Sequence, residues 1–216
     1  MDLDALLAAY PADHSQEPRD RTRPHQAVAG IVSTLGGISL DGGLYRVFRA
    51  AETEVWSATA HRAFPDLAGR ATVFAADWLG RLFAADTGRV DAVGTPLVLM
   101  LEPGTGEALE VPVSVETLHT TELIAEADAA LAASFYEAWR GESGDTRPLS
   151  TTECVGYRVP LFLGGADEVS NLERTDMDVY WTLSAQMRHR ATGLPPGTPI
   201  RAVEAQPSKQ RLFRRK

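Results

Sequence analysis

The chain has 216 residues, of which 44% are hydrophobic and 23% are charged. These values are typical of one globular domain with a hydrophobic core, and no apolar run approaches the roughly 20 residues that span a bilayer. The single cysteine excludes an internal disulfide. The N-terminus begins with acidic residues and lacks the basic segment of a secretory signal, so we expect a cytoplasmic protein that does not associate with membranes.

Charge is distributed unevenly along the chain. The formal net charge is −8, but the last ten residues, "PSKQRLFRRK", contain five Lys/Arg and no acid. Subtracting five from 21 leaves 16 basic against 29 acidic residues, which is −13 for residues 1–206. DNA binding depends on neutralising phosphates with Lys and Arg, so we expect no specific nucleic-acid binding by the folded body. An acidic body favours a basic protein partner, and the oligomeric state stays open.

The chain order predicts three parts. Residues 1–26 read as a short helix followed by a polar arm, residues 27–206 as one α+β domain, and residues 207–216 as a basic tail. Within the domain, a short strand is predicted at Leu44–Phe48, and an amphipathic helix follows it and ends at Pro65.

From Ala71 onward, apolar residues alternate as they do in strands. Residues 97–101 and 109–113 form a predicted hairpin connected by "EPGTGE". Ser114 is a suitable helix cap, and a helical stretch with a break near 120–121 follows it. The expected fold is a mostly antiparallel sheet of about four to six strands with helices packed on it.

The last elements surround a double glycine. "VGYRVPLFL" alternates from Val155 to Leu163 and predicts a strand that Pro160 places at a sheet edge or interrupts. Gly164 and Gly165 fit a turn that requires positive φ. A final helix is predicted to begin near Asp176 and to end before Gly193.

Common catalytic motifs are missing from the sequence. "PGTGE" has Glu107 where a phosphate-binding loop needs lysine, and both of its flanks read as strands. The five histidines are far apart and show no metal-ligand spacing, and Cys154 reads as a packed thiol. We therefore expect no metal, no cofactor and no catalytic residues.

Carboxylates cluster around the double glycine. Paired acids can act as a glycosidase couple or hold Mg²⁺, and a cleft with Glu153, Asp176 and Arg158 keeps open an enzyme or a small-ligand-binding domain. The other interpretation is a turn with an acidic surface, in which Asp176 caps the last helix and Asp178 complements its dipole. The second interpretation is the one we favour.

The same stretch carries a long motif. "ECVGYRVPLFLGGADEVSNLERTDMDVYW", with "DWLGRLFA" and "LEPGTGE" before it, resembles the C-terminal domain of bacterial immunity proteins that neutralise type VI secretion DNase toxins. The resemblance extends over residues 71–200, and the strand order is also similar, more weakly, to the SUKH immunity group. The matching positions include Cys154, Gly156, Tyr157, Pro160, Gly164, Gly165, Asn171, Tyr180 and Trp181.

This resemblance implies an antidote that inhibits a cognate nuclease toxin by binding and not by catalysis. An inhibitor of a DNA-cutting enzyme has to cover a basic surface, and carboxylates can take the place of phosphates there. The predicted toxin-binding residues are Asp167, Glu168, Glu173, Asp176 and Asp178. We expect Tyr157, Tyr180 and Trp181 to belong to the core.

Overall fold

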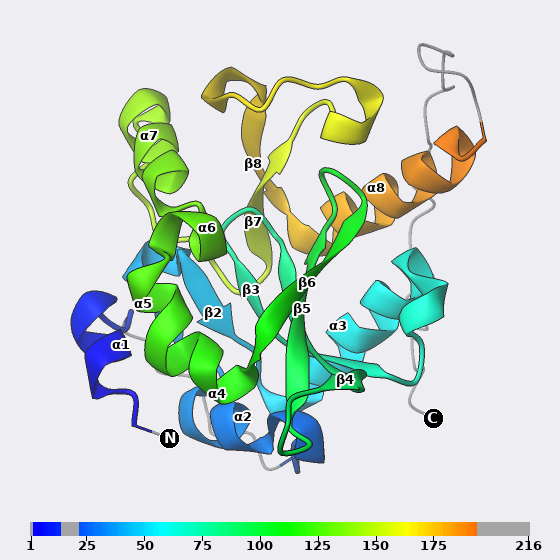
Figure 1. The fold of residues 1–216 in the computed structure, drawn as a ribbon. Helices are drawn as coiled ribbons and strands as arrows, with labels where there is room; N and C mark the ends of the chain where they lie inside the picture. The colour runs from blue at the N-terminus through cyan, green and yellow to red at the C-terminus, as the bar shows by residue number, and fades with distance from the viewer. Residues whose placement is uncertain (1, 14–21, 194–216) are drawn as a thin grey trace, which may run out of the picture.

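The structure is a computed structural model that describes residues 2–13 and 22–193. An antiparallel six-stranded sheet, β1 to β6 in chain order, lies at the centre, and a separate antiparallel pair, β7 and β8, lies beside it (Figure 1). The predicted α+β class with a mostly antiparallel sheet is confirmed. The basic tail and the turn expected after Gly193 lie outside the described residues.

The strands differ in length. The six-stranded sheet consists of β1 (Ser39–Leu40), β2 (Tyr45–Val47), β3 (Ala71–Asp77), β4 (Leu82–Val90), β5 (Pro96–Glu102) and β6 (Glu107–Ser114). The second sheet consists of β7 (Glu153–Tyr157) and β8 (Leu172–Asp176).

The helices are mostly short. They are α1 (Asp4–Ala9), α2 (Ala29–Leu35), α3 (Ala50–Ala63), α4 (Val115–Thr117), α5 (Leu123–Ala125), α6 (Ala127–Leu131), α7 (Ala133–Ser143) and α8 (Met177–Ala191). Single helical turns are η1 (Gln26–Val28), η2 (Asp41–Gly43), η3 (Pro65–Leu67), the π-helical η4 (Leu118–Glu122), η5 (Leu161–Leu163) and η6 (Val169–Asn171).

Helices cover both faces of the central strands. Side chains alternate in direction along a strand, so Val98 and Met100 of β5 pack in one core cluster while Leu99 and Leu101 pack in the other. Figure 1 shows α3 and α8 on the right of the sheet and α1 and α4–α7 on the left. Both faces of β3 and of the first half of β4 are therefore largely buried, which matches their mostly apolar sequences.

The N-terminal helix packs on this body. Leu3 and Leu6 are buried in the larger core cluster, and the hydroxyl of Tyr10 donates to the carbonyl of Leu123 at 2.6 Å. Ala12 also bridges to β1. Helix α1 is therefore attached to the domain, and the domain boundary expected at residues 26–27 stays a prediction.

The helical stretch after Ser114 is broken more often than its sequence predicts. The expected break near residues 120–121 falls inside the π-helical turn η4. Further interruptions follow at Glu126 and at Ala132, which has a left-handed φ of 50°.

The last strands differ from the sequence-based expectation. The predicted strand up to Leu163 ends at Tyr157, because Pro160 cannot donate a ladder hydrogen bond and residues 161–163 turn into η5. Residues 172–176, for which no strand was predicted, form β8 and pair with β7. The β7–β8 pair forms its own two-stranded sheet and does not extend the six-stranded sheet.

Candidate functional site

The segment from β7 to α8 contacts two of the hairpin turns of the main sheet, the β3–β4 turn and the β5–β6 turn. The indole of Trp181 donates to the carbonyl of Gly80 at 2.7 Å, and the backbone N–H of Val155 donates to the carbonyl of Trp78 at the same distance. The backbone N–H of Phe162 donates to the carbonyl of Gly104, at 3.3 Å, in the second turn. The three stretches of the motif are thus one contact region in space.

The aromatic residues of the motif form its interior. Tyr157, Tyr180 and Trp181 are all buried, as expected for core residues. Gly156 leaves room for the ring of Tyr180, since a Cβ there would lie 2.8 Å from a ring carbon. The hydroxyl of Tyr180 in turn accepts from the N–H of Tyr157 at 3.3 Å.

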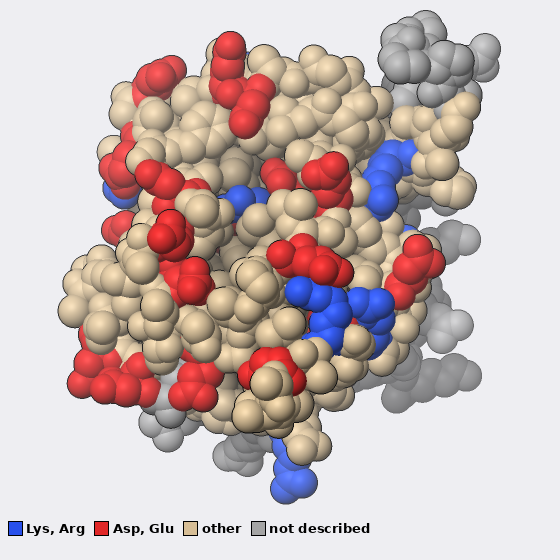
Figure 2. Space-filling model, viewed as in Figure 1, with Lys and Arg blue, Asp and Glu red and all other residues tan. Residues whose placement is uncertain are grey.

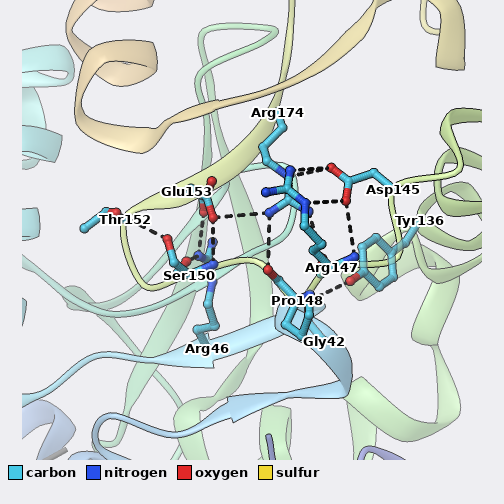
Figure 3. A network of polar contacts seen from close by, with 10 residues as sticks. All are labelled: Gly42, Arg46, Tyr136, Asp145, Arg147, Pro148, Ser150, Thr152, Glu153 and Arg174. Atoms are coloured by element: carbon cyan, nitrogen blue, oxygen red, sulfur yellow. Dashed lines mark hydrogen bonds and ion pairs between the residues drawn. The ribbon is translucent and has the colours of Figure 1, made fainter.

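A polar network fixes the loop that leads into β7 (Figure 3). Arg174 donates to Asp145 at 2.9 Å, to the carbonyl of Arg147 at 2.7 Å, and to the carbonyl of Pro148 and the carboxylate of Glu153 at 3.2 Å each. The guanidinium of Arg147 is the main cause that lowers the pKa of Asp145 to about 2. The network thus ties residues 145–153 to β8.

A buried arginine on β2 also binds this loop. Arg46 of β2 donates to the carbonyls of Ser150 and Glu153 at 2.5 Å and to the carbonyl of Asp77 at 3.1 Å. Figure 3 shows its side chain rising from β2 toward the Ser150–Glu153 turn. Arg46 and Arg174 both bind groups of the protein itself, so this network stabilises the fold.

The carboxylate cleft considered as an alternative is not assembled. Glu153 and Asp176 are opposite each other in the β7–β8 register, but Arg158 lies beyond the other end of β7 and pairs with Glu173. Partial burial would raise the pKa of Glu153, yet hydrogen bonds from Ser150 and Arg174 outweigh it and lower the pKa. A carboxylate held in its charged form this way is a poor general acid.

The five predicted toxin-binding carboxylates are all exposed, and several of them also make contacts within the protein. Asp167 accepts from the hydroxyl of Tyr157 at 2.6 Å, and Asp176 caps α8 by accepting from the N–H of Val179 at 3.0 Å. Glu173 projects from β8 toward Arg158 at 3.4 Å.

The remaining two predicted carboxylates, Glu168 and Asp178, make no ion pair within the described residues. Glu168 precedes η6 at the top of β8, and Asp178 lies in the first turn of α8. A toxin-binding role for the five residues stays a prediction.

Acidic groups outside the predicted set lie close to Asp167. The carboxyl of Glu102, at the end of β5, is partly buried; burial raises its pKa, and Asp77, Asp167 and Glu107 add repulsion that Arg81 partly offsets. The sequence analysis missed Glu102 and Glu107 as site candidates, although both flank the "PGTG" turn of the motif. Figure 2 shows acidic side chains over the left-hand helices and over the loop above β8.

Cys154 is buried against the turn that contains Gly80, and burial raises the pKa of its thiol. A thiol in this environment packs as an apolar group, as the sequence analysis expected. Among residues 2–13 and 22–193, no cluster of His, Cys, Asp or Glu has a geometry that could hold a metal ion. In the same part of the chain, no helix is long and apolar enough to cross a membrane.

Gly164 and Gly165 are required for different physical reasons. Gly164 has a φ of +86°, as expected, whereas Gly165 does not have positive φ. A Cβ at Gly165 would instead collide with the carbonyl oxygen of Val159 and lie 2.8 Å from the amide nitrogen of Asn171. Asn171 holds this turn by donating to the carbonyls of Val159 and Ala166 at 2.9 Å each.

We expect Gly165→Ala to destabilise the protein more than Gly164→Ala. The collision should cost about 3 kcal/mol of unfolding free energy. The strained φ at the open Gly164 position should cost about 1 kcal/mol. Urea denaturation of both variants measures the difference. Equal losses, or a larger loss at Gly164, would contradict the contact that the structure places at Gly165.

Comparisons with known proteins agree with this geometry. Residues 144–188 match the family model described as T6SS immunity protein Tdi1, C-terminal. No curated protein sequence matches the chain. The crystal structure of Atu4351 from Agrobacterium tumefaciens is similar, with a TM-score of 0.59 and 12% identity over 86% of this chain and 89% of that chain. At this identity, the structural likeness establishes the fold alone.

The matched segment begins in the loop held by Arg174 and ends in α8, so it contains β7, β8 and the double glycine. The weaker likeness to the SUKH group is not confirmed. The resemblance to immunity proteins is confirmed: residues 144–188 match the C-terminal domain of the T6SS immunity protein Tdi1 family.

Proposed function

We propose that this protein is an immunity protein that binds and inhibits a cognate secreted nuclease toxin in the cytoplasm. The observation that carries the proposal is the match of residues 144–188 to a type VI secretion immunity family. A binding role is supported by the internal contacts of Asp167, Arg174 and Asp176, which fix the shape of this segment. Its outer surface, however, keeps carboxylates available.

Charge supports a nuclease as the partner. A DNA-cutting enzyme needs basic residues to bind phosphates, and residues 1–206 carry 29 acidic against 16 basic residues. Complementary charge steers the encounter and raises the association rate at low salt. The exposed carboxylates of Glu168, Glu173 and Asp178, together with Asp167 and Asp176, are the proposed contacts.

Capture from the native host tests this function. The full chain should retain a protein that degrades plasmid DNA, and equimolar addition of the chain should abolish that degradation. A second chain ending at Gln206 should inhibit equally, because the basic tail is not part of the matched segment. Captured proteins without nuclease activity, or DNA degradation that the chain leaves unchanged, would overturn the proposal.

Charge reversal tests the proposed surface. We expect the double variant Glu168→Lys/Glu173→Lys to bind the captured nuclease more slowly at low salt while its melting temperature stays nearly unchanged. Asp167 is left intact, because its reversal would remove the acceptor of the Tyr157 hydroxyl. Glu54→Lys/Asp66→Lys, at exposed positions on α3 and η3, changes the net charge by the same amount and serves as the matched control.

The association rate decides between two surfaces in this experiment. A double variant that associates like the wild type would move the interface away from β8. A control variant that slows association as much would show a general charge effect.

A further inference from the structure

A small pocket opens between the β7–β8 pair and helix α8. Its volume is about 100 Å³, and its lining comes from Gly156–Arg158, Glu173, Thr175 and the α8 residues between Val179 and Met187. Every lining residue belongs to the segment that matches the immunity family. A pocket of this size is suited to one long side chain and is too small for a nucleotide.

The pocket walls on α8 are mostly apolar. Val179, Leu183 and Met187 recur at intervals of four residues and so lie along one face of the helix. Val179 is 45% exposed, so part of this apolar row is open to solvent. An aliphatic stem lying along this row would remove apolar surface from water.

Two charged groups line the pocket, the carboxylate of Glu173 and the guanidinium of Arg158. The carboxylate of Glu173 lines it and is 54% exposed, and its contact with Arg158 is a surface ion pair at 3.4 Å. Exposed pairs of this kind contribute little, so an incoming cation can compete for the carboxylate. Ser184 also lines the pocket, and its buried hydroxyl oxygen has no hydrogen-bond partner within the described residues.

We propose that this pocket receives a lysine or arginine side chain of the toxin, with the stem along α8 and the charged head at Glu173. The inference rests on the proposed function and adds a specific contact to it. A long basic side chain is the occupant that matches both the aliphatic row and the carboxylate. A nuclease presents such side chains on the surface that an inhibitor has to cover.

The pocket can be tested without the toxin. The protein is titrated with N-acetyl-lysine methylamide or N-acetyl-arginine methylamide, and binding is followed by NMR. We expect the backbone amide signals of Gly156, Thr175 and Ser184 to shift and to reach saturation. The uncharged isostere N-acetyl-norleucine methylamide should shift them much less, and Glu173→Gln should abolish the difference. Absent shifts at these amides, or equal shifts with the isostere, would overturn the proposal.

Binding of the captured nuclease supplies the second arm. Val179→Trp, which covers the pocket mouth, should weaken affinity tenfold or more, as expected for an anchor residue. Val159→Trp is the matched control, because Val159 is 47% exposed and does not line the pocket. Similarly, Glu173→Gln should weaken binding, whereas Glu110→Gln, which breaks an equally long pair with Arg89 at 3.4 Å, should not.

The two experiments distinguish a failure of the pocket proposal from a failure of the proposed function. Nuclease binding that survives both Val179→Trp and Glu173→Gln would overturn the pocket while leaving the immunity function intact. If no nuclease is captured at all, the immunity function fails, and the NMR titration alone decides whether the pocket prefers cations.

Discussion

Replacing Arg46 with methionine is expected to lower the free energy of unfolding by about 3 kcal/mol, because buried acceptors left without a donor cost about 1–3 kcal/mol each. Arg46 is 3% exposed and donates to the carbonyls of Ser150, Glu153 and Asp77. Methionine fills a similar length but donates nothing, so these acceptors lose their partner. Urea denaturation followed by circular dichroism measures the loss.

Arg147→Met is the matched control for this experiment. The Arg147 side chain is 72% exposed and forms its ion pair with Asp145 at the surface, so its removal should cost less than about 1 kcal/mol. Because Arg46 ties β2 to the start of the family segment, its loss should also speed proteolysis of the loop around Ser150. A variant as stable as the wild type would mean that this loop is held by Arg174 alone.

The stability of the protein is expected to fall by about 2 kcal/mol between pH 7 and pH 4.5 because of His119. This side chain is fully buried, and burial lowers its pKa from 6.5 to about 4. It donates from Nδ1 to the carbonyl of Val115 at 2.7 Å and pairs through Nε2 with the hydroxyl of Tyr45 at 2.9 Å. Both contacts suit the neutral ring.

The direction of this pH effect follows from where protons bind. Between pH 6.5 and about 4, the unfolded chain protonates His119 while the folded chain keeps it neutral, so acid favours unfolding. His119→Gln retains a donor and an acceptor but does not titrate. The loss of stability between pH 7 and pH 4.5 should therefore be smaller in this variant than in the wild type by the amount that His119 contributes. Equal pH dependence in both proteins would show that carboxylates account for all of the loss.

Much of the fold can be predicted from the sequence because local patterns decide it. Leu97, Leu99 and Leu101 alternate as a strand must, and the "EPGTGE" turn between them and the return strand is observed as the β5–β6 hairpin. The cap at Asp176 was also predicted, since a short carboxylate side chain before a helix accepts from the first free N–H groups.

The candidate site depends more on contacts between distant residues. Glu102 and Asp167 are 65 positions apart in the sequence, and only the docking of the last segment on the hairpin turn brings their charges together. Spacing along the chain carries no information about such a distant pair. Arg158 and Glu153, which were considered as parts of one cleft, lie at opposite ends of β7 and bind different partners.

The sequence by itself determined the α+β class, the acidic body and the likeness to an immunity family, because composition, periodicity and a long motif are all properties of the linear chain. Only the tertiary structure decided which groups Arg46 binds, why position 165 requires glycine and which carboxylates make internal contacts. A hydrogen-bond acceptor or a steric limit comes from residues that folding brings near. The pocket beside Glu173 has the same origin, since its walls come from two strands and a helix that meet only in the folded protein.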